Sequence, residues 1–306
     1  MNAVDCLSTA FFVKYYESEG TLQMKRILCT LLALAMILTL ALTLASCGKD
    51  ASGDLETIKA AGVIKVGMEC AYAPYNWSQT TENENTVKIS DGMYADGYDV
   101  QIAKKIAEAL GVELVIVPTE WNGLIPALNA GSIDMVIAGM SPTEDRKLSI
   151  DFSDTYFDSN LVMVVKKDSD FAAATKLSDF TGAKITGQIN TFHYKVIDQI
   201  EGVDKQNALD DFAALTQALA AGSIDGYVCE KPGAISAVAA NADFAFVEFA
   251  EGEGFECDPA ESSISVGVRK GSTLTAEINK VLSGISTHEK EALMDAAIAR
   301  QPVTEE

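Results

Sequence analysis

Residues 120–157 read EWNGLIPALNAGSIDMVIAGMSPTEDRKLSIDFSDTYF. Apolar residues at helical spacing are followed by Gly131, which can take the left-handed conformation that ends a helix. Residues 133–138 then form an apolar run of strand length. A polar loop follows, and Thr143 can cap a second short helix, which places Arg146 one turn inside it. The pattern predicts backbone N–H groups, hydroxyls and a guanidinium at the carboxyl end of a strand, a place suited to a carboxylate.

Part of this stretch occurs twice. ALNAGSID at residues 127–134 returns as ALAAGSID at residues 218–225, with seven of eight residues the same. In both copies a helical pattern ends at glycine, an apolar strand follows, and then a polar loop with proline. One repeat at this distance is too few for a solenoid. It favours two α/β lobes that each offer a loop at the same place; the alternative is chance similarity in a chain rich in alanine and glycine.

Helix-like and strand-like segments alternate along the rest of the chain. Asp99 is expected to cap the strongest amphipathic helix. Residues 69–77 are an unusually aromatic loop, and residues 78–91 read as a polar excursion or hairpin. The alternation predicts α/β lobes with largely parallel sheets, whose ligands bind beyond the carboxyl ends of the strands. The expected strands are 63–68, 112–117, 133–138, 161–165, 183–186, 226–230, 244–249 and 263–268, and the expected helices include 55–61, 99–110, 192–202, 211–221, 234–241, 274–285 and 290–300.

Length and charge limit the class of protein. The 306 residues are enough for two domains, and 48% hydrophobic with 22% charged residues is typical of a globular protein. The net charge of −21 disfavours nucleic acid as a partner, because phosphates are bound by Lys and Arg. The two histidines, His193 and His288, are expected at the surface, without a metal ligand set. Neither a phosphate loop nor a Ser/His/Asp set suggests an enzyme, and we expect no cofactor and no metal.

The amino terminus reads as a targeting segment. Two basic residues at 25–26 precede an apolar run, 27–45, and Leu-Ala-Ser-Cys at 44–47 is followed by glycine. A transmembrane anchor of about 20 residues is one interpretation. The other, which we favour, is a bacterial lipobox, which this stretch resembles, with Cys47 as the lipid acceptor. We therefore expect residues 1–46 to be a precursor segment, Met24 to be the true start, and residues 47–54 to be a lipid-anchored tether.

Three cysteines remain beyond the tether: Cys70, Cys229 and Cys257. An odd number without close spacing is neither a disulfide framework nor a zinc site. A pair between Cys229 and either of the others stays open, but three thiols are the simpler interpretation.

The chain resembles the polar amino-acid solute-binding proteins of bacterial ABC importers, solute-binding protein family 3. The residues that carry this resemblance are GYDVQIA at 97–103, the stretch 124–156 with its G-x-S-x-T-x-x-R pattern at 139–146, and DFS at 151–153. The resemblance implies a two-lobed α/β fold of the type II periplasmic-binding-protein kind that closes like a hinge on one amino acid. It implies lobe 1 at 55–157 plus 263–306, lobe 2 at 158–262, and crossings near 156–160 and 260–264.

The resemblance also implies roles for individual residues. The carboxylate clamp would be Arg146, helped by Ser141 and the Thr191 backbone, and the amino group would meet the Gly139 carbonyl, the Ser141 hydroxyl and Glu230. Asn190 stands where the family usually has glycine; asparagine tolerates the left-handed conformation better than most residues, so the turn can survive. Glutamate replaces the usual aspartate at positions 69 and 230, which lengthens the reach of both. An aromatic sandwich of Tyr72 and Trp121, the side-chain reader Glu69, and Met140 and Gln188 complete the predicted site.

The chemistry of these residue types agrees with that implication. A zwitterion needs a cation and an anion that face each other across a partly dry cleft, and Arg146 can grip a carboxylate with two hydrogen bonds where lysine cannot. Glu230, expected in the second lobe, would meet the ammonium only on closure. Glu69 beside two aromatic rings suits a cationic side chain. Each residue also has a plainer interpretation: Arg146 as a surface charge, the aromatic residues as core.

We therefore expect an extracytoplasmic lipoprotein, anchored to the cell membrane, that binds lysine, arginine or ornithine and delivers it as a monomer to an ABC permease and its ATPase. Glutamine or histidine as ligand, a sensory or adhesion lipoprotein, and a cyclohexadienyl dehydratase-like enzyme are the alternatives.

Overall fold

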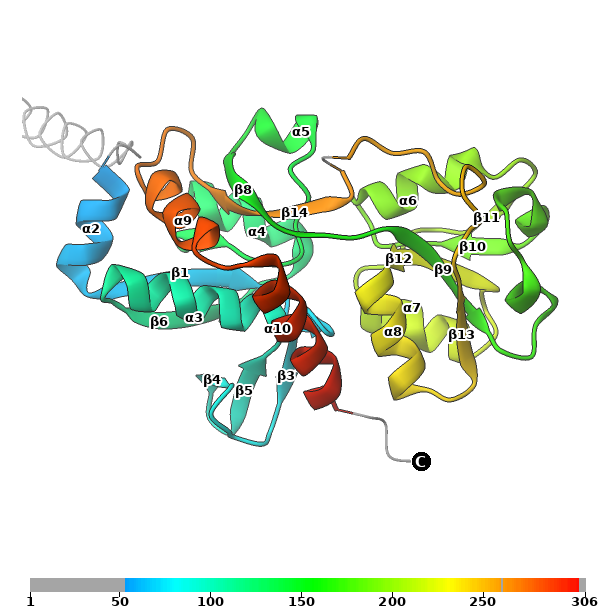
Figure 1. The fold of residues 1–306 in the computed structure, drawn as a ribbon, viewed down its shortest axis with the longest axis horizontal. Coiled ribbons are helices and arrows are strands. Elements are labelled where there is room, and N and C mark those ends of the chain that lie inside the picture. The colour runs from blue at the N-terminus through cyan, green and yellow to red at the C-terminus, as the bar shows by residue number, and fades with distance from the viewer. Residues whose placement is uncertain (1–52, 260, 303–306) are drawn as a thin grey trace, which may run out of the picture. The chain divides into compact units, whose positions relative to one another are not determined.

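The computed structural model describes residues 53–259 and 261–302 (Figure 1). The expected signal segment, the start at Met24, the lipid acceptor Cys47 and nearly all of the tether lie outside the described residues. Among the helices of the described part, none combines the length and the apolar character that crossing a bilayer requires.

The first lobe is built on a five-stranded mixed sheet in the order β6-β1-β7-β14-β8. β1 pairs in parallel with β6 and with β7, whereas β14 runs antiparallel to both of its neighbours. Its strands are β1 (Val63–Met68), β6 (Glu113–Pro118), β7 (Met135–Val136), β8 (Asp151–Asp158) and β14 (Ser263–Val268), and its helices are α2 (Asp54–Ala61), α3 (Tyr98–Leu110), α4 (Trp121–Asn129), α5 (Glu144–Lys147), α9 (Leu274–Ser283) and α10 (Thr287–Arg300).

The second lobe repeats this plan with the order β11-β10-β12-β9-β13. β10 pairs in parallel with β11 and β12, and β9 runs antiparallel to β12 and β13. Its strands are β9 (Leu161–Lys166), β10 (Lys184–Thr186), β11 (Asp204–Lys205), β12 (Gly226–Glu230) and β13 (Phe244–Val247), and its helices are α6 (Phe192–Val196), α7 (Phe212–Ala220) and α8 (Lys231–Ala240), with the 3-10 turns η2 (Asp170–Ala173), η3 (Leu177–Phe180) and η4 (Ile197–Gln199).

The prediction of largely parallel sheets is therefore wrong for half of each sheet. The antiparallel part of each sheet contains the strand that enters it from the other lobe, β9 in the second and β14 in the first (Figure 1). Two strands of one sheet run parallel when a helix of the same lobe connects them, as in a βαβ unit. A strand that enters from the other lobe has no such connecting helix, so this rule does not fix its direction.

The repeated sequence forms the same structure twice. After α4, Asp134 receives a hydrogen bond from the Lys65 backbone N–H at 2.9 Å and returns one to the Lys65 carbonyl at 2.8 Å. After α7, Asp225 makes the same two bonds with Lys184, both at 2.8 Å. Each copy therefore locks the chain leaving a helix to the neighbouring strand, which sets the register of β7 and β12 beside β1 and β10.

Two neighbouring segments join the lobes. β8 continues through Ser159 and Asn160 into β9, and β14 brings the chain back (Figure 1). The two segments pair at the crossing, where Asp158 lies opposite Ser263 and the Ser159 N–H donates to the Ser262 carbonyl at 3.2 Å.

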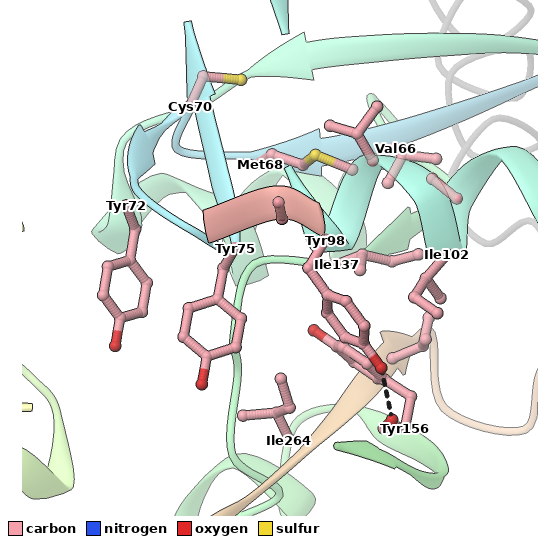
Figure 2. Close-up of a cluster of buried hydrophobic side chains, with 14 of the residues drawn as sticks. Val66, Met68, Cys70, Tyr72, Tyr75, Tyr98, Ile102, Ile137, Tyr156 and Ile264 are labelled. Carbon is pink, nitrogen blue, oxygen red and sulfur yellow. Dashed lines mark hydrogen bonds between the residues drawn. The ribbon is translucent and has the colours of Figure 1, made fainter. Parts of the chain in front are cut away.

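The polar excursion at 78–91 takes the hairpin form. An antiparallel sheet in the order β2-β3-β5-β4 contains β2 (Ala71–Tyr72), β3 (Asn76–Gln79), β4 (Val87–Ser90) and β5 (Met93–Asp96). The aromatic loop that precedes it turns Tyr72 and Tyr75 side by side on one face of lobe 1 (Figure 2).

Asp99 is not the cap of α3, because that helix begins at Tyr98 with Gly97 in the capping position. The Asp99 carboxylate is instead fully buried and accepts hydrogen bonds from Asn76 and Tyr156, each at 2.8 Å. Tyr98 donates to the Tyr156 carbonyl at 2.9 Å (Figure 2). This buried polar group ties the aromatic loop and α3 to the strand that leads into the crossing.

Candidate functional site

The two lobes meet in a cleft. Many of the residues that line it are ones that the sequence predicted for the site. A small cavity of about 10 Å³ lies at its centre. This is room for about one water molecule, so the lobes are closed upon each other. The cavity is lined by the predicted residues Tyr72, Trp121, Gly139, Ser141, Arg146, Gln188 and Thr191, and by Ala138, Phe192, His193 and Phe212.

Arg146 spans the cleft. Thr143 caps α5 by accepting from the Arg146 N–H at 3.4 Å, as the sequence predicted, and this sets the start of the short helix. The guanidinium donates to the Ser141 carbonyl at 2.9 Å and, across the cleft, to the Asn190 carbonyl at 3.1 Å. Burial lowers the pKa of Arg146 to about 10, against the opposing influence of Glu230. The side chain is therefore cationic at neutral pH and only partly solvated.

Glu230 ends β12 and is 1% exposed. Tyr72 donates its hydroxyl hydrogen to one carboxylate oxygen, and His193 Nε2 lies 3.0 Å from the other. Burial alone raises the pKa of Glu230, but the neighbouring His193, which favours the carboxylate most strongly when it is protonated, and the Tyr72 hydroxyl outweigh burial and hold the pKa below its usual value. Lobe 2 thus presents an anion to a cleft where lobe 1 presents a cation.

His193 is the clearest correction to the sequence prediction. It is 4% exposed rather than at the surface, and it contacts Glu230 from α6. His288 is exposed, as predicted.

The two predicted sandwich rings lie against different partners. Tyr72 stacks on Phe212 of the second lobe, with ring centroids 3.8 Å apart and planes within 10°. The Trp121 ring lies beneath the Arg146 guanidinium, 4.9 Å from centroid to Cζ. Phe212 follows Trp121 by 91 positions, the offset of the repeat, so the duplicated helix start was a signal that could have identified it.

Glu69 borders a second, larger cavity of about 400 Å³. Gln188 donates to Glu69 Oε1 across the cleft at 2.8 Å, while the other carboxylate oxygen is buried without a hydrogen-bond partner among the described residues. Burial raises the pKa of Glu69 to about 8, with a smaller contribution from the charge of Asp211. The residues that line this cavity include four carboxylates and no lysine or arginine: Glu69, Ala71, Pro118, Thr119, Glu120, Trp121, Asn122, Asp210 and Asp211.

The turn from Gln188 to Thr191 faces lobe 1. Asn190 has φ of 57°, so the left-handed turn predicted to survive the loss of glycine is confirmed. Its side chain donates to Asn122 Oδ1 at 2.7 Å across the mouth of the cleft, a contact that glycine cannot make. Thr191 donates its hydroxyl hydrogen to the Gln188 carbonyl at 2.6 Å. Its backbone N–H lies at the start of α6.

Residues 139–141 form the loop after β7. Gly139 has φ of 59°, and a Cβ atom there would lie 3.3 Å from the Tyr72 ring. Ser141 is buried beside it. Met140 does not bring its side chain to the cavity; it packs in the lobe 1 core with Leu124, Leu128 and Ile150.

Cys70, Cys229 and Cys257 are all free thiols, in agreement with the simpler interpretation.

The sequence profile of the bacterial extracellular solute-binding proteins, family 3, matches residues 64–296. The chain belongs to this family. Its fold is accordingly the two-lobed periplasmic-binding-protein fold, α/β with mixed sheets.

Curated relatives and solved structures extend the likeness over most of the chain. The arginine-binding extracellular protein ArtP of Bacillus subtilis is 30% identical over 82% of this chain and 90% of its own length. The L-cystine-binding protein TcyJ of Escherichia coli is 29% identical over 72% and 75%. The crystal structure of an amino acid ABC transporter substrate-binding protein from Streptococcus pneumoniae bound to L-arginine superposes with a TM-score of 0.69, at 25% identity over 80% of this chain and 98% of that one.

Proposed function

We propose that this family 3 protein binds a free amino acid in the cleft between its lobes and delivers it to an ABC permease and its ATPase, without catalysing a reaction. The observation that carries the proposal is the opposition of two partly or fully buried charges: Arg146 on lobe 1 and Glu230 on lobe 2. A zwitterionic ligand neutralises both, and it does so only when the lobes close.

The α-carboxylate is assigned to the Arg146 guanidinium, the Ser141 hydroxyl and the Thr191 backbone N–H. The α-ammonium is assigned to Glu230, the Gly139 carbonyl and the Ser141 hydroxyl. Arg146 now donates to two carbonyls, at Ser141 and Asn190, which are neutral acceptors and weaker than a carboxylate. A ligand carboxylate would replace one or both of these bonds with a stronger one.

We further propose that the ligand carries a cationic side chain: lysine, arginine or ornithine. The larger cavity supports this, since it has four carboxylates and no basic residue in its lining. Glu69 has a buried oxygen without a partner, which a guanidinium or ammonium would satisfy. Trp121 lines both cavities, so a side chain that leaves the α-carbon site along this ring would reach Glu69. Arginine-binding relatives add weight to this assignment, and the cystine-binding relative shows that the family accommodates other ligands.

The proposed placement of the protein follows from its first residues. A signal segment, an acylated Cys47 and a short tether would hold a monomeric receptor at the outer face of the cell membrane, within reach of its permease. Labelling with a radioactive fatty acid tests the anchor: Cys47→Ala should abolish incorporation, and continued incorporation would show that Cys47 is not the acceptor.

A thermal-shift screen of the refolded mature protein against the common amino acids tests the ligand. At a hundredfold excess over Kd a ligand stabilises a protein by about 2.7 kcal/mol, which raises Tm by about 5–10 °C for a chain of this size. We expect arginine, lysine and ornithine to give the largest shifts. Larger shifts with glutamine or cystine would contradict the cationic assignment, and no shift with any amino acid would contradict the proposed function.

A further inference from the structure

His193 lies beneath the proposed ammonium site and has a role there that the charge pair of Arg146 and Glu230 does not explain. Its Nε2 is 3.0 Å from Glu230 Oε1. Among the described residues, Nδ1, Nε2 and Glu230 Oε1 are all buried without a hydrogen bond of good geometry, so the approach of Nε2 to Oε1 is a close polar contact. A neutral imidazole has one donor and one acceptor nitrogen. Because Nε2 is the nitrogen that lies against Glu230, the tautomer with the proton on Nε2 is the one that can turn a donor toward the carboxylate, and Nδ1 is then the bare acceptor.

The Glu230 carboxylate can serve several donors at once. Two carboxylate oxygens offer about four lone-pair positions. Tyr72 donates to one oxygen, and His193 Nε2 lies 3.0 Å from the other. Positions remain available to an ammonium group, so Tyr72 and His193 can hold the carboxylate between them without exhausting it.

We propose that His193 is a positioning residue for the amino group of the ligand: as a neutral imidazole it orients Glu230, and binding of an amino acid disfavours its protonated form. This inference rests on the proposed function of the cleft.

The charges around the pair explain why the imidazole must be neutral. A protonated His193 would leave Glu230 as one anion beside two cations, His193 and the ligand ammonium, with Arg146 as a third cation across the cleft. An uncompensated charge in a buried site is strongly destabilising. The ligand carboxylate compensates Arg146, so the excess positive charge would fall on His193.

None of the other groups that we find near His193 supplies a negative charge that would compensate a protonated imidazole. Burial raises the pKa of Tyr72, of Tyr75 and of the Cys229 thiol well above their usual values, so all three stay neutral. Burial also raises the pKa of Asp99, to about 6, and its carboxylate is already held by Tyr156 and Asn76 inside lobe 1. Phe192 and Phe212, the rings packed on His193, carry no charge. Lys195, on the same helix, is exposed and cationic.

Affinity should therefore fall as the solution becomes acidic. Imidazoles take up protons between about pH 5 and 8. If binding requires release of that proton, the dissociation constant rises by up to about tenfold per pH unit on the acid side, and up to one proton appears in solution for each ligand bound.

Calorimetric titration with L-arginine between pH 5 and 8, in buffers of different ionisation enthalpy, measures both quantities. We compare the wild type with His193→Gln, whose amide can donate to Glu230 but cannot titrate, and with His288→Gln, which removes the exposed histidine. His193→Gln should weaken binding at pH 8 by no more than about tenfold and lose most of the slope below pH 7. His288→Gln should keep the wild-type slope. Glu69 and Asp99 also titrate, but they are present in all three proteins, so the difference between the curves belongs to His193.

A slope in His193→Gln equal to that of the wild type would overturn the inference alone. Failure of every amino acid to bind at any pH would overturn the proposed function, and the inference with it. Because the chain has only two histidines, long-range ¹H–¹⁵N spectra of the wild-type imidazoles provide a measurement that does not depend on the folding of a variant. We expect the Nε2–H tautomer of His193 in the arginine complex at pH 6; an imidazolium in that complex would overturn the inference.

Discussion

At the scale of single residues, Arg146 is the residue whose replacement should affect binding most, because it donates hydrogen bonds to both lobes at once. Arg146→Ala should weaken amino-acid binding by a hundredfold or more, since charge-assisted hydrogen bonds contribute about 1.5–3 kcal/mol each. Arg146→Lys should recover little, because an ammonium cannot present two parallel donors to a carboxylate. Calorimetry gives both values.

The neighbouring Lys147 provides the control. It pairs at 2.9 Å with Glu144 at the surface, and such pairs contribute about 0–1 kcal/mol. Lys147→Ala should bind normally. Near-normal affinity in Arg146→Ala would instead show that the carboxylate site lies elsewhere.

Glu69 should decide between ligands rather than determine whether any ligand binds. Glu69→Gln keeps a partner for Gln188 but removes the charge from the acidic cavity. It should weaken arginine by about tenfold to a hundredfold and glutamine by less than about threefold, because only the cationic side chain uses that charge. Competition titrations compare the two ligands. Equal losses for both would show that Glu69 does not read the side chain.

Glu69 also predicts a dependence of stability on pH in the ligand-free protein. Its folded pKa, about 8, lies above the ordinary 4.5, so between these values the unfolded chain is ionised while the folded chain keeps its proton. Stability should consequently fall as pH rises from about 4.5 to 8. Glu69→Gln should remove this loss, which we expect on the order of 1–2 kcal/mol because Glu69 is only partly buried. Thermal unfolding at pH 5 and pH 8 measures it; an unchanged difference in Tm would contradict the assignment.

The position of a site residue could be predicted where its type and its neighbours in the sequence indicate its role. It could not be predicted where the role depends on a residue that is distant in the sequence. Arg146 follows a capping threonine in the short helix after a strand, and Glu230 ends an apolar strand, so local pattern places both near the carboxyl ends of strands. His193 has no such pattern, because its role comes from Glu230, a residue of another element. Asp99 looked like a helix cap for the same reason: only the folded chain brings Asn76 and Tyr156 to its carboxylate.

At the scale of elements, the repeat explains how the two halves of the site correspond. Trp121 and Phe212 begin the two equivalent helices, each 91 positions from the other. Gly139, in the loop after β7, and Glu230, the last residue of β12, are also 91 positions apart. The lobes therefore offer the same positions to the cleft with different chemistry: a carbonyl and a tryptophan from one, a carboxylate and a phenylalanine from the other. Sequence periodicity shows this equivalence, but not that the second half of each sheet runs antiparallel, because those strands pair with segments distant in the chain.

The turn before α6 contains Asn190, where the resemblance had led us to expect glycine. Asn190→Gly keeps the left-handed turn but loses the bond to Asn122, whereas Asn190→Ala loses the bond and adds about 1–2 kcal/mol of backbone strain. Both should release ligand faster, by about twofold to fivefold for glycine, as expected for one exposed hydrogen bond. Stopped-flow fluorescence of Trp121 follows the release. Asn122→Ala should match Asn190→Gly, and a release rate equal to the wild type in both would show that the contact does not hold the cleft closed.

At the scale of the whole molecule, α10 links the lobes at a point away from the two crossings. Arg300 pairs with Asp96 of lobe 1 at 3.1 Å, and the next residue, Gln301, reaches α8 of lobe 2. There the Gln301 amide donates to the Ser236 carbonyl at 2.9 Å, and the Ser236 hydroxyl donates to the Gln301 side-chain oxygen. Opening the cleft by rotation about the crossings would have to move α8 relative to α3, against which α10 packs. Both hydrogen bonds are buried, so they favour the closed arrangement.

Gln301→Ala should consequently shift the protein toward open forms. Loss of two buried hydrogen bonds that leave Ser236 unpaired costs about 1–3 kcal/mol, and a closed state disfavoured by that amount binds ligand about fivefold to a hundredfold more weakly. Small-angle X-ray scattering should show a larger radius of gyration without ligand and the wild-type value at saturating arginine. Glu289→Gln is the matched control, because Glu289 lies on the same helix but pairs with Lys105 inside lobe 1 at 2.6 Å. If Gln301→Ala lowered Tm but left both the radius and the affinity unchanged, the contact would stabilise the end of α10 without taking part in closure.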